Sequence, residues 1–458
     1  MNTCSLRSLV LPTLLIMVHQ AAAENGYFAP ATSYQVGSSP VCVATMDVNG
    51  NGKIALISAN LIDGIDGTLT VLTNNGSGGC GSNATLVVGS YPFAVAAADV
   101  NGDGKPDLIS ADIGDGTLTI LTNNGSGGFG FNATLNVGLS ISSGPAFVLT
   151  ADVNGDGKLD LISANTGDNT VTVLTNNGSG GFVLDATLTV GAYPVSVAAV
   201  DINGNGKIAL VSANEFDGTL TVLTNDGIGG FGYNATLNVG SSVPNSGGPA
   251  SVVAADINGN HKPGLICANS VDNTLIVLTN NGSGGFGSNA TLVVGSGPLC
   301  VTATDVNGDG RPDLVCANSG DGTLTVLTNN GSGGFGSHAT LTVGFFAGSY
   351  PQSVVAADLN GDGLPDLVSA NYTDNSLSVL LNGADAPDSP SLTISLTNSH
   401  TVVISWPAPS DGFGLQQNSN LSTMNWLDFS GTVTTNGTTK SATISPATNN
   451  LFFRLCHP

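Results

Sequence analysis

The chain has 458 residues, enough for two or three domains. Only 9 residues are Lys or Arg against 32 that are Asp or Glu, so the formal net charge is −23 at pH 7. This balance argues against nucleic acid and anionic membranes as partners and suits cations. The 63 glycines follow no Gly-X-Y period, which argues against a collagen-like chain.

Residues 1–23 are typical of a secretory signal peptide. Arg7 supplies the positive charge, residues 9–18 form an apolar run, and Ala21-Ala22-Ala23 fits the small-residue cleavage rule, which leaves Glu24 as the first mature residue. The run is short for a membrane span and Pro12 interrupts it. We therefore expect a secreted or cell-surface protein with no transmembrane segment in the mature chain.

Six cysteines remain after residue 23, in a compartment that permits disulfides, but their spacing does not fix their pairing. Cys300 and Cys316 flank one loop, and a disulfide across that hairpin is one prediction. The alternative is that Cys267 and Cys316, which stand where other repeats have Ser, are simply small buried residues.

A unit of about 50 residues recurs along the chain, which suggests a solenoid or a propeller blade. Each unit contains four short β-branched segments separated by turn residues, of the types "SVVAAD", "PDLISAN", "TLTVLTNN" and "ATLTVG". Four antiparallel strands per repeat favour a β-propeller. An aspartate anchors the loop after the first segment of each unit, at Asp47, Asp99, Asp152, Asp201, Asp256, Asp305 and Asp358.

The last unit lacks its fourth segment, whereas residues 27–37 at the other end of the chain resemble one. The N-terminal strand is therefore predicted to complete the last blade, which would close a ring and remove its exposed edges. We expect an all-β fold, with a seven-bladed propeller over residues 24–383.

The repeats differ in length in only two classes of connection, at residues 60–68, 138–145, 240–249 and 344–351. In an up-and-down unit both classes open on one face, opposite the acidic loops. Loops on a rigid scaffold often carry function, so this face is a candidate binding surface. Insertions are also tolerated at any exposed loop, and the sequence leaves both interpretations open.

The acidic loop has the pattern D-x-N-x-D-G-x-x-D, which offers oxygen ligands at positions 1, 3, 5 and 9 and a carbonyl at position 7. Calcium prefers oxygen ligands of this kind. An EF-hand would need Glu at position 12 and flanking helices, and neither is present. The predicted calcium ligands of the four complete loops are Asp99, Asn101, Asp103, Lys105 and Asp107; Asp152, Asn154, Asp156, Lys158 and Asp160; Asp305, Asn307, Asp309, Arg311 and Asp313; and Asp358, Asn360, Asp362, Leu364 and Asp366.

Three loops keep one carboxylate where the complete loops have three. Because affinity follows the charge of the ligands, we expect about four occupied Ca²⁺ sites with a structural role and three weak or empty loops. A polar turn without an ion is the alternative. The replacements in the incomplete loops are Asn51 and Ala55; Asn205 and Ala209; and Asn260, His261 and Gly264.

The chain resembles the FG-GAP repeat propellers of the integrin-α type. The resemblance is carried by Phe-Gly and Gly-Pro pairs, such as Phe129-Gly130 with Gly144-Pro145, and by the D-x-N-G-D-G-x-x-D loops between the first and second strands. It covers about three quarters of the chain. It implies a seven-bladed propeller with calcium in some hairpin loops and ligand binding or adhesion at the opposite face. Exported bacterial proteins with such repeats are the nearer comparison.

Residues 384–390 form a linker that contains Pro and Asp. Residues 391–458 contain Trp406 and Trp426, and several strand-like segments predict a small β-sandwich. The segment "VVISWPAP" is weakly similar to fibronectin type III. The two tryptophans could stack on a sugar, but packing in a core is the commoner role.

The pattern favours an exported calcium-binding propeller that acts as an adhesion or ligand-binding module towards an extracellular protein or glycan. A lectin-like, carbohydrate-binding propeller is the alternative, although residues 24–383 contain no Trp. A polysaccharide-acting enzyme is less favoured, because no G-x-S-x-G or H-E-x-x-H motif is present. We therefore expect a non-enzyme.

Overall fold

The computed structural model describes residues 6–11, 14–19, 28–61, 67–138, 144–240, 248–345, 348–383, 393–398, 401–407, 414–418, 427–437, 439–444 and 451–456. Every regular element in these ranges is a β-strand. No helix in the described ranges is long and apolar enough to cross a membrane. The chain divides into two compact units, Pro30–Asn382 on the one hand and Met1–Ala29 with Gly383–Pro458 on the other.

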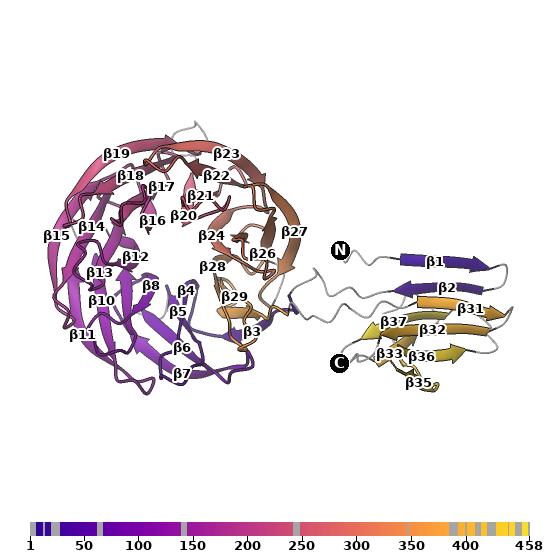
Figure 1. Ribbon diagram of the computed structural model, residues 1–458. Coiled ribbons are helices and arrows are strands. Elements are labelled where there is room, and N and C mark those ends of the chain that lie inside the picture. The colour runs from indigo at the N-terminus through magenta and orange to yellow at the C-terminus, as the bar shows by residue number, and fades with distance from the viewer. Residues whose placement is uncertain are drawn as a thin grey trace. The chain divides into compact units, whose positions relative to one another are not determined.

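The unit Pro30–Asn382 is built from four-stranded antiparallel sheets, which Figure 1 shows following one another around a common axis. The predicted all-β fold with repeated four-stranded units is confirmed. The first strand of each sheet begins with Pro, which cannot donate to a ladder and is tolerated at a strand start. The first strands are β4 (Pro40–Met46), β8 (Pro92–Ala98), β12 (Pro145–Ala151), β16 (Pro194–Val200), β20 (Pro249–Ala255), β24 (Pro298–Thr304) and β28 (Pro351–Ala357).

The second and third strands form the centre of each sheet and are almost wholly buried. The second strands are β5 (Ala55–Asn60), β9 (Asp107–Asp112), β13 (Asp160–Asn165), β17 (Ala209–Asn214), β21 (Gly264–Asn269), β25 (Asp313–Asn318) and β29 (Asp366–Asn371). The third strands are β6 (Thr68–Asn74), β10 (Thr117–Asn123), β14 (Thr170–Asn176), β18 (Thr219–Asn225), β22 (Thr274–Asn280), β26 (Thr323–Asn329) and β30 (Ser376–Leu380).

The fourth strands lie on the outside and alternate between half-buried and exposed residues. They are β7 (Cys80–Val87), β11 (Phe129–Asn136), β15 (Phe182–Thr189), β19 (Phe231–Asn238), β23 (Phe286–Val293) and β27 (Phe335–Thr342). In the last sheet this place is taken by β3 (Thr32–Gln35), which pairs with β30. The predicted pairing of the N-terminal strand with the last repeat is therefore confirmed.

The hydrophobic core lies between neighbouring sheets. One cluster joins Ile57 and Leu69 of the first sheet to Leu108 of the second. Another joins Leu56 of the first sheet to Val368 and Leu377 of the last. Burial on both sides explains why the second strands are apolar along their whole length.

The second unit contains two sheets, with strand orders β31-β32-β36-β35 and β1-β2-β37-β33-β34. Trp406 is buried, whereas Trp426 lies outside the described residues. Residues of the expected signal peptide form a hairpin whose second strand pairs in parallel with β37. The strands are β1 (Leu6–Leu11), β2 (Leu14–His19), β31 (Thr393–Asn398), β32 (Thr401–Pro407), β33 (Gly414–Asn418), β34 (Leu427–Asp428), β35 (Val433–Asn436), β36 (Thr439–Ile444) and β37 (Leu451–Cys456).

The predicted disulfide between Cys300 and Cys316 is wrong, because both are free thiols. In the register of β24 and β25, Cys316 lies opposite Val301 and Cys300 lies opposite Ala317. Successive side chains of a strand point to opposite faces, so the two thiols point away from each other. The alternative is confirmed: Cys267 and Cys316 are fully buried small residues.

Candidate functional site

The aspartate at position 1 of each acidic loop closes the loop on its own backbone. Asp99 Oδ1 accepts the N–H groups of Gly102 at 2.8 Å and Asp103 at 3.2 Å, and Oδ2 accepts that of Gly104 at 2.7 Å. Gly102 and Gly104 have φ of 77° and 80°, which glycine adopts without strain. Asp201 of an incomplete loop makes the same contacts. Position 1 therefore shapes the loop whether or not the other carboxylates are present.

Positions 3, 5 and 7 have the same backbone contacts in complete and incomplete loops, and the difference among them is the charge at position 5. Asn101 Oδ1 accepts the Asp103 N–H at 2.9 Å, and Asp103 Oδ1 accepts the Lys105 N–H at 3.0 Å. The Lys105 ammonium also lies 3.6 Å from the Asp103 carboxylate, and Asp156–Lys158 and Asp309–Arg311 form equivalent pairs. In an incomplete loop Asn replaces Asp, and Lys262 instead donates to the carbonyl of Asn281 at 3.0 Å.

The aspartate at position 9 lies beneath the loop. It is the first residue of the second strand, and its side chain is fully buried. Asp107 accepts the N–H of Asn123 at 2.9 Å and that of Val100 at 3.3 Å. Burial raises its pKa, and the nearby carboxylates of Asp103 and Asp99 raise it further. Asp160, Asp313 and Asp366 accept the equivalent two backbone N–H groups. Burial raises the pKa of each of them as well, and for Asp366 it raises the pKa to about 6.

The donor atoms of a complete loop fit a hard cation such as calcium, since all are carboxylate, amide or carbonyl oxygens. Each carboxylate oxygen can accept more than one hydrogen bond or cation contact. In the described part of the chain, however, no three His, Cys, Asp or Glu side chains converge on one point that could hold a metal ion. The loops are closed around backbone N–H groups, and calcium binding stays a prediction.

An asparagine at or just after the end of each third strand joins neighbouring sheets, and the sequence reasoning missed this role. Asn176 Nδ2 donates to the carbonyl of Val100, in the acidic loop of the preceding sheet, at 2.8 Å. It also donates to the carbonyl of Leu159 in its own loop at 2.8 Å. The acidic loop is therefore held to the next sheet. The bonds between sheets measure 2.6 to 2.8 Å and link Asn74 to Leu359, Asn123 to Val48, Asn176 to Val100, Asn225 to Val153, Asn280 to Ile202, Asn329 to Ile257 and Asn382 to Val306.

The two ends of the sheets differ in chemistry. We call the end with the acidic loops and the turns between third and fourth strands the loop face, and the opposite end the connecting face. All six Lys and Arg residues between Pro30 and Asn382 lie in the acidic loops. Exposed large apolar side chains on the described part of the connecting face include Tyr91, Phe216, Phe345 and Tyr350.

Three tyrosines of the connecting face have a strained backbone. Tyr91, Tyr193 and Tyr350 each precede the first proline of a sheet and have φ of 55°, 59° and 48°. Bulky side chains rarely adopt this region, and Gly297 occupies the same place with φ of 62°. The Tyr193 ring stacks on Phe216, with centroids 4.1 Å apart and an interplanar angle of 6°. Ser39 before Pro40 has the same conformation, with φ of 57°, so the turn imposes it whatever the side chain.

Much of the candidate binding face predicted from the insertions falls outside the described residues. Residues 62–66, 139–143, 241–247 and 346–347 are not described. The described remainder shows that the two classes of connection do meet: Asp217 of a turn between second and third strands accepts the N–H of Ala192 at 2.6 Å. The equivalent bond joins Asp115 to Ser90.

Asp112 is a second feature that the sequence reasoning missed. Other sheets have Asn at this position, and Asn165 donates to the hydroxyls of Thr170 and Thr172. Asp112 accepts from the hydroxyls of Ser110 and Thr119, each at 2.6 Å. Burial raises the pKa of Asp112 to about 6. The hydroxyl of Thr117, which corresponds to Thr170, is buried without a hydrogen-bond partner.

A family model described as an FG-GAP-like repeat matches residues 47–110, 99–163, 152–212, 201–267, 262–316 and 305–369. The matches run from the first acidic loop into the last repeat and cover more than half of the chain. Comparison with curated proteins gave no match.

Solved structures with the same architecture share little sequence with this chain. BBS1N in complex with ARL6DN has a TM-score of 0.57 and 14% identity, with 79% of this chain and 99% of that chain covered. A putative 6-phosphogluconolactonase from Bacteroides uniformis has a TM-score of 0.53 and 15% identity, with 66% and 85% covered. A protein from Lactobacillus plantarum has a TM-score of 0.51 and 18% identity, with 72% and 89% covered. At these identities the likeness concerns the fold alone.

Proposed function

This chain belongs to the FG-GAP-like repeat family, and from this premise we propose that it is an exported ligand-binding module. In this proposal it recognises an extracellular protein or glycan with its connecting face and holds calcium in the four complete loops of its loop face. The role includes adhesion and involves no catalytic step. The observation that carries the proposal is the group of exposed aromatic rings, Tyr91, Phe216, Phe345 and Tyr350, on the connecting face, at the other end of the sheets from the acidic loops.

The proposal includes a closed ring of seven blades. The hydrogen bond from Asn74 to Leu359 joins the first sheet to the last in the manner that joins consecutive sheets elsewhere. The core cluster that contains Leu56 and Val368 spans the same two sheets. A ring closed in this way gives the connecting face a rigid base, which lowers the entropy lost on binding.

Calcium supports this module by holding the loop face together. Asp99, Asn101 and Asp103 would supply side-chain oxygens and Lys105 its carbonyl, while buried Asp107 adds negative charge beneath the loop. The carbonyl of Val100 in the same loop accepts the bond from Asn176 of the next sheet. An ion that orders the loop therefore also orders the contact between two sheets, and it stabilises the folded state by mass action.

A protein ligand and a glycan ligand are both compatible with this face. Among chains of similar fold, BBS1N is found in complex with ARL6DN, which agrees with a propeller used for recognition. Exposed aromatic rings such as Tyr91 and Tyr350 suit either ligand class.

Binding of the purified chain to a glycan array and to a panel of extracellular proteins, with and without chelator, tests the proposal. We expect a ligand whose binding falls when calcium is removed, because the ring loosens. Undiminished binding after chelation would contradict the supporting role of calcium. Absence of binding on both panels would contradict the ligand-binding role.

A further inference from the structure

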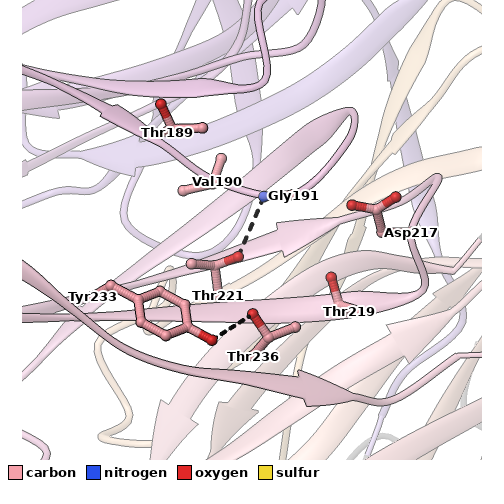
Figure 2. Close-up of a pocket in the computed structure, with 8 residues that line it drawn as sticks. All are labelled: Thr189, Val190, Gly191, Asp217, Thr219, Thr221, Tyr233 and Thr236. Carbon is pink, nitrogen blue, oxygen red and sulfur yellow. Dashed lines mark hydrogen bonds between the residues drawn. The ribbon is translucent and has the colours of Figure 1, made fainter.

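We propose that the sheet of β16 to β19 carries a binding site for a neutral pyranose sugar. The inference rests on the ligand-binding role proposed above and assigns it one ligand class and one site. The site is a hollow of about 380 Å³ where the end of β15 meets β18 and β19 (Figure 2). Its polar and aromatic lining consists of Thr189, Asp217, Thr219, Thr221, Tyr233 and Thr236.

Tyr233 provides an aromatic platform at the hollow. Its side chain is 68% exposed. The phenol hydroxyl donates to Thr236 Oγ1 at 3.1 Å, so the ring is held along β19 before a ligand arrives (Figure 2). The electron-rich face of such a ring attracts the polarised C–H groups on one face of a pyranose, and it also shields them from water.

Asp217 provides a fixed acceptor in the same hollow. Its Oδ2 accepts the N–H of Ala192 at 2.6 Å, which leaves Oδ1 for a sugar hydroxyl. The backbone nearby is also fixed, because Gly191 N–H donates to Thr221 Oγ1 at 3.3 Å (Figure 2). Thr189 and Thr236 are exposed and add hydroxyl groups that both donate and accept. Groups positioned in advance lose little entropy when they bind.

The charge around the hollow selects a neutral ligand. No Lys or Arg lines it, and the cations of this unit lie in the acidic loops. The Asp217 carboxylate would repel a uronic acid, a sulfate or a phosphate. A cationic side chain could contact Asp217 and Tyr233 but would make no use of the threonine hydroxyls around them. Thr219 and Thr221 are buried and already accept hydrogen bonds from Asn214. The exposed hydroxyls of Thr189 and Thr236 remain, and a polyhydroxy ring can use them together with Asp217 and Tyr233, so we commit to a sugar.

Tyr233 stands at a place that most other sheets fill without an aromatic ring. In the strand register Tyr233 lies opposite Leu223, and the equivalent places hold Ser82, Ser288 and Ser337 in three other sheets. Serine at this place is therefore compatible with the fold. Phe131 occupies the equivalent place in β11, so Phe131→Ser removes an exposed ring from a different sheet and serves as the matched control.

The test is ligand-observed NMR on the full chain with methyl glycosides of neutral hexoses and N-acetylhexosamines, together with a methyl glucuronide and a lysine-rich peptide. We expect at least one neutral glycoside to bind through its ring C–H face. Tyr233→Ser should weaken it by a factor of ten or more, Tyr233→Phe should keep most of the affinity, and Phe131→Ser should change nothing. Absence of any bound neutral glycoside overturns the inference, as does binding of only the glucuronide or the peptide.

The same variants distinguish this inference from the broader proposal. A glycan or protein ligand that Tyr233→Ser binds as well as the unchanged chain does would overturn the sugar site in this hollow and leave the ligand-binding role standing. Failure of the unchanged chain on both the glycan and protein panels would overturn both.

Discussion

Asn74 donates a side-chain hydrogen bond to the main-chain carbonyl of Leu359 at 2.6 Å, across 285 residues of sequence. The bond joins the first four-stranded sheet to the acidic loop of the last. Because the same bond joins each of the other sheets to its predecessor, Asn74 and Leu359 are the place where ring closure can be tested.

Asn74→Ala should lower the free energy of unfolding by about 1 to 3 kcal/mol, since it leaves a buried carbonyl without its donor. Chemical denaturation of the full chain measures the effect. Asn176→Ala is the matched variant, because Asn176 makes the equivalent bond between consecutive sheets. The two losses should be similar. If Asn74→Ala left the free energy of unfolding unchanged while Asn176→Ala lowered it, a closed ring would be contradicted.

Asp103→Asn should weaken calcium binding at one loop without breaking that loop's backbone contacts. The incomplete loop shows why: Asn205 Oδ1 accepts the Lys207 N–H at 2.9 Å, just as Asp103 accepts that of Lys105 at 3.0 Å. The variant removes one of three carboxylates, and affinity follows ligand charge. Calorimetric titration with calcium should show either one binding site fewer or one site whose affinity is much lower. An unchanged titration would contradict the predicted ligand set, and Asn205→Asp serves as the reverse variant.

Asp112→Asn should stabilise the protein at neutral pH and reduce the pH dependence of its stability. Burial raises the pKa of Asp112 from 3.8 to about 6, so the folded state holds its proton more tightly than the unfolded state does. The contribution of Asp112 to stability is therefore full below about pH 4 and falls as pH rises through 6. An asparagine would also donate to Thr117, whose hydroxyl is buried without a partner.

The expected gain for Asp112→Asn at pH 7 is about 2 to 3 kcal/mol, and it should shrink towards zero near pH 4. Denaturation at several pH values, in the presence of chelator, measures it. Asp272→Asn, at the equivalent exposed position of another sheet, is the control. A gain that does not change between pH 4 and 7 would show that the pKa of Asp112 is not raised.

Tyr193→Gly should leave stability almost unchanged but weaken ligand binding at the connecting face. Glycine removes about 1 kcal/mol of strain at φ of 59°, and the variant loses a stacked pair with Phe216 of similar worth. Thermal unfolding and binding to the ligand found on the panels are the two readouts. Binding equal to that of the unchanged chain would place recognition away from Tyr193.

Export should remove residues 1–23. Expression of the full chain in a secreting bacterium, followed by intact mass determination of the exported protein, should give a chain that begins at Glu24. An exported or cell-bound product that retains residue 1 would contradict the signal peptide. It would agree instead with residues 14–19 forming a strand beside β37.

Much of the fold could be predicted from the sequence because the repeat carries redundant information. The strand pattern, the turn residues and the missing fourth strand of the last unit recur at fixed spacing, and β3 pairs with β30 as expected. The prediction of a disulfide across the hairpin was wrong, because the spacing of cysteines in the sequence does not show which face of a strand each side chain occupies. The register shows that Cys300 and Cys316 lie on opposite faces.

The candidate site was less predictable, because its contacts cross from one sheet to the next. The sequence motif predicted that Asp99 and Asp103 offer oxygen ligands. It could not show that Asp107 begins a buried strand and accepts two backbone N–H groups. In five of the seven repeats this asparagine was visible in a recurring "TNN". Its partner in the preceding loop is set by three-dimensional packing, which no local pattern encodes.

We propose that the complete acidic loops are calcium sites and that the incomplete ones are only turns. Calorimetric titration of the chelator-stripped full chain with calcium chloride should give a stoichiometry of about four, because ligand charge determines affinity. No binding would contradict calcium in these loops, and seven equal sites would contradict the division between complete and incomplete loops.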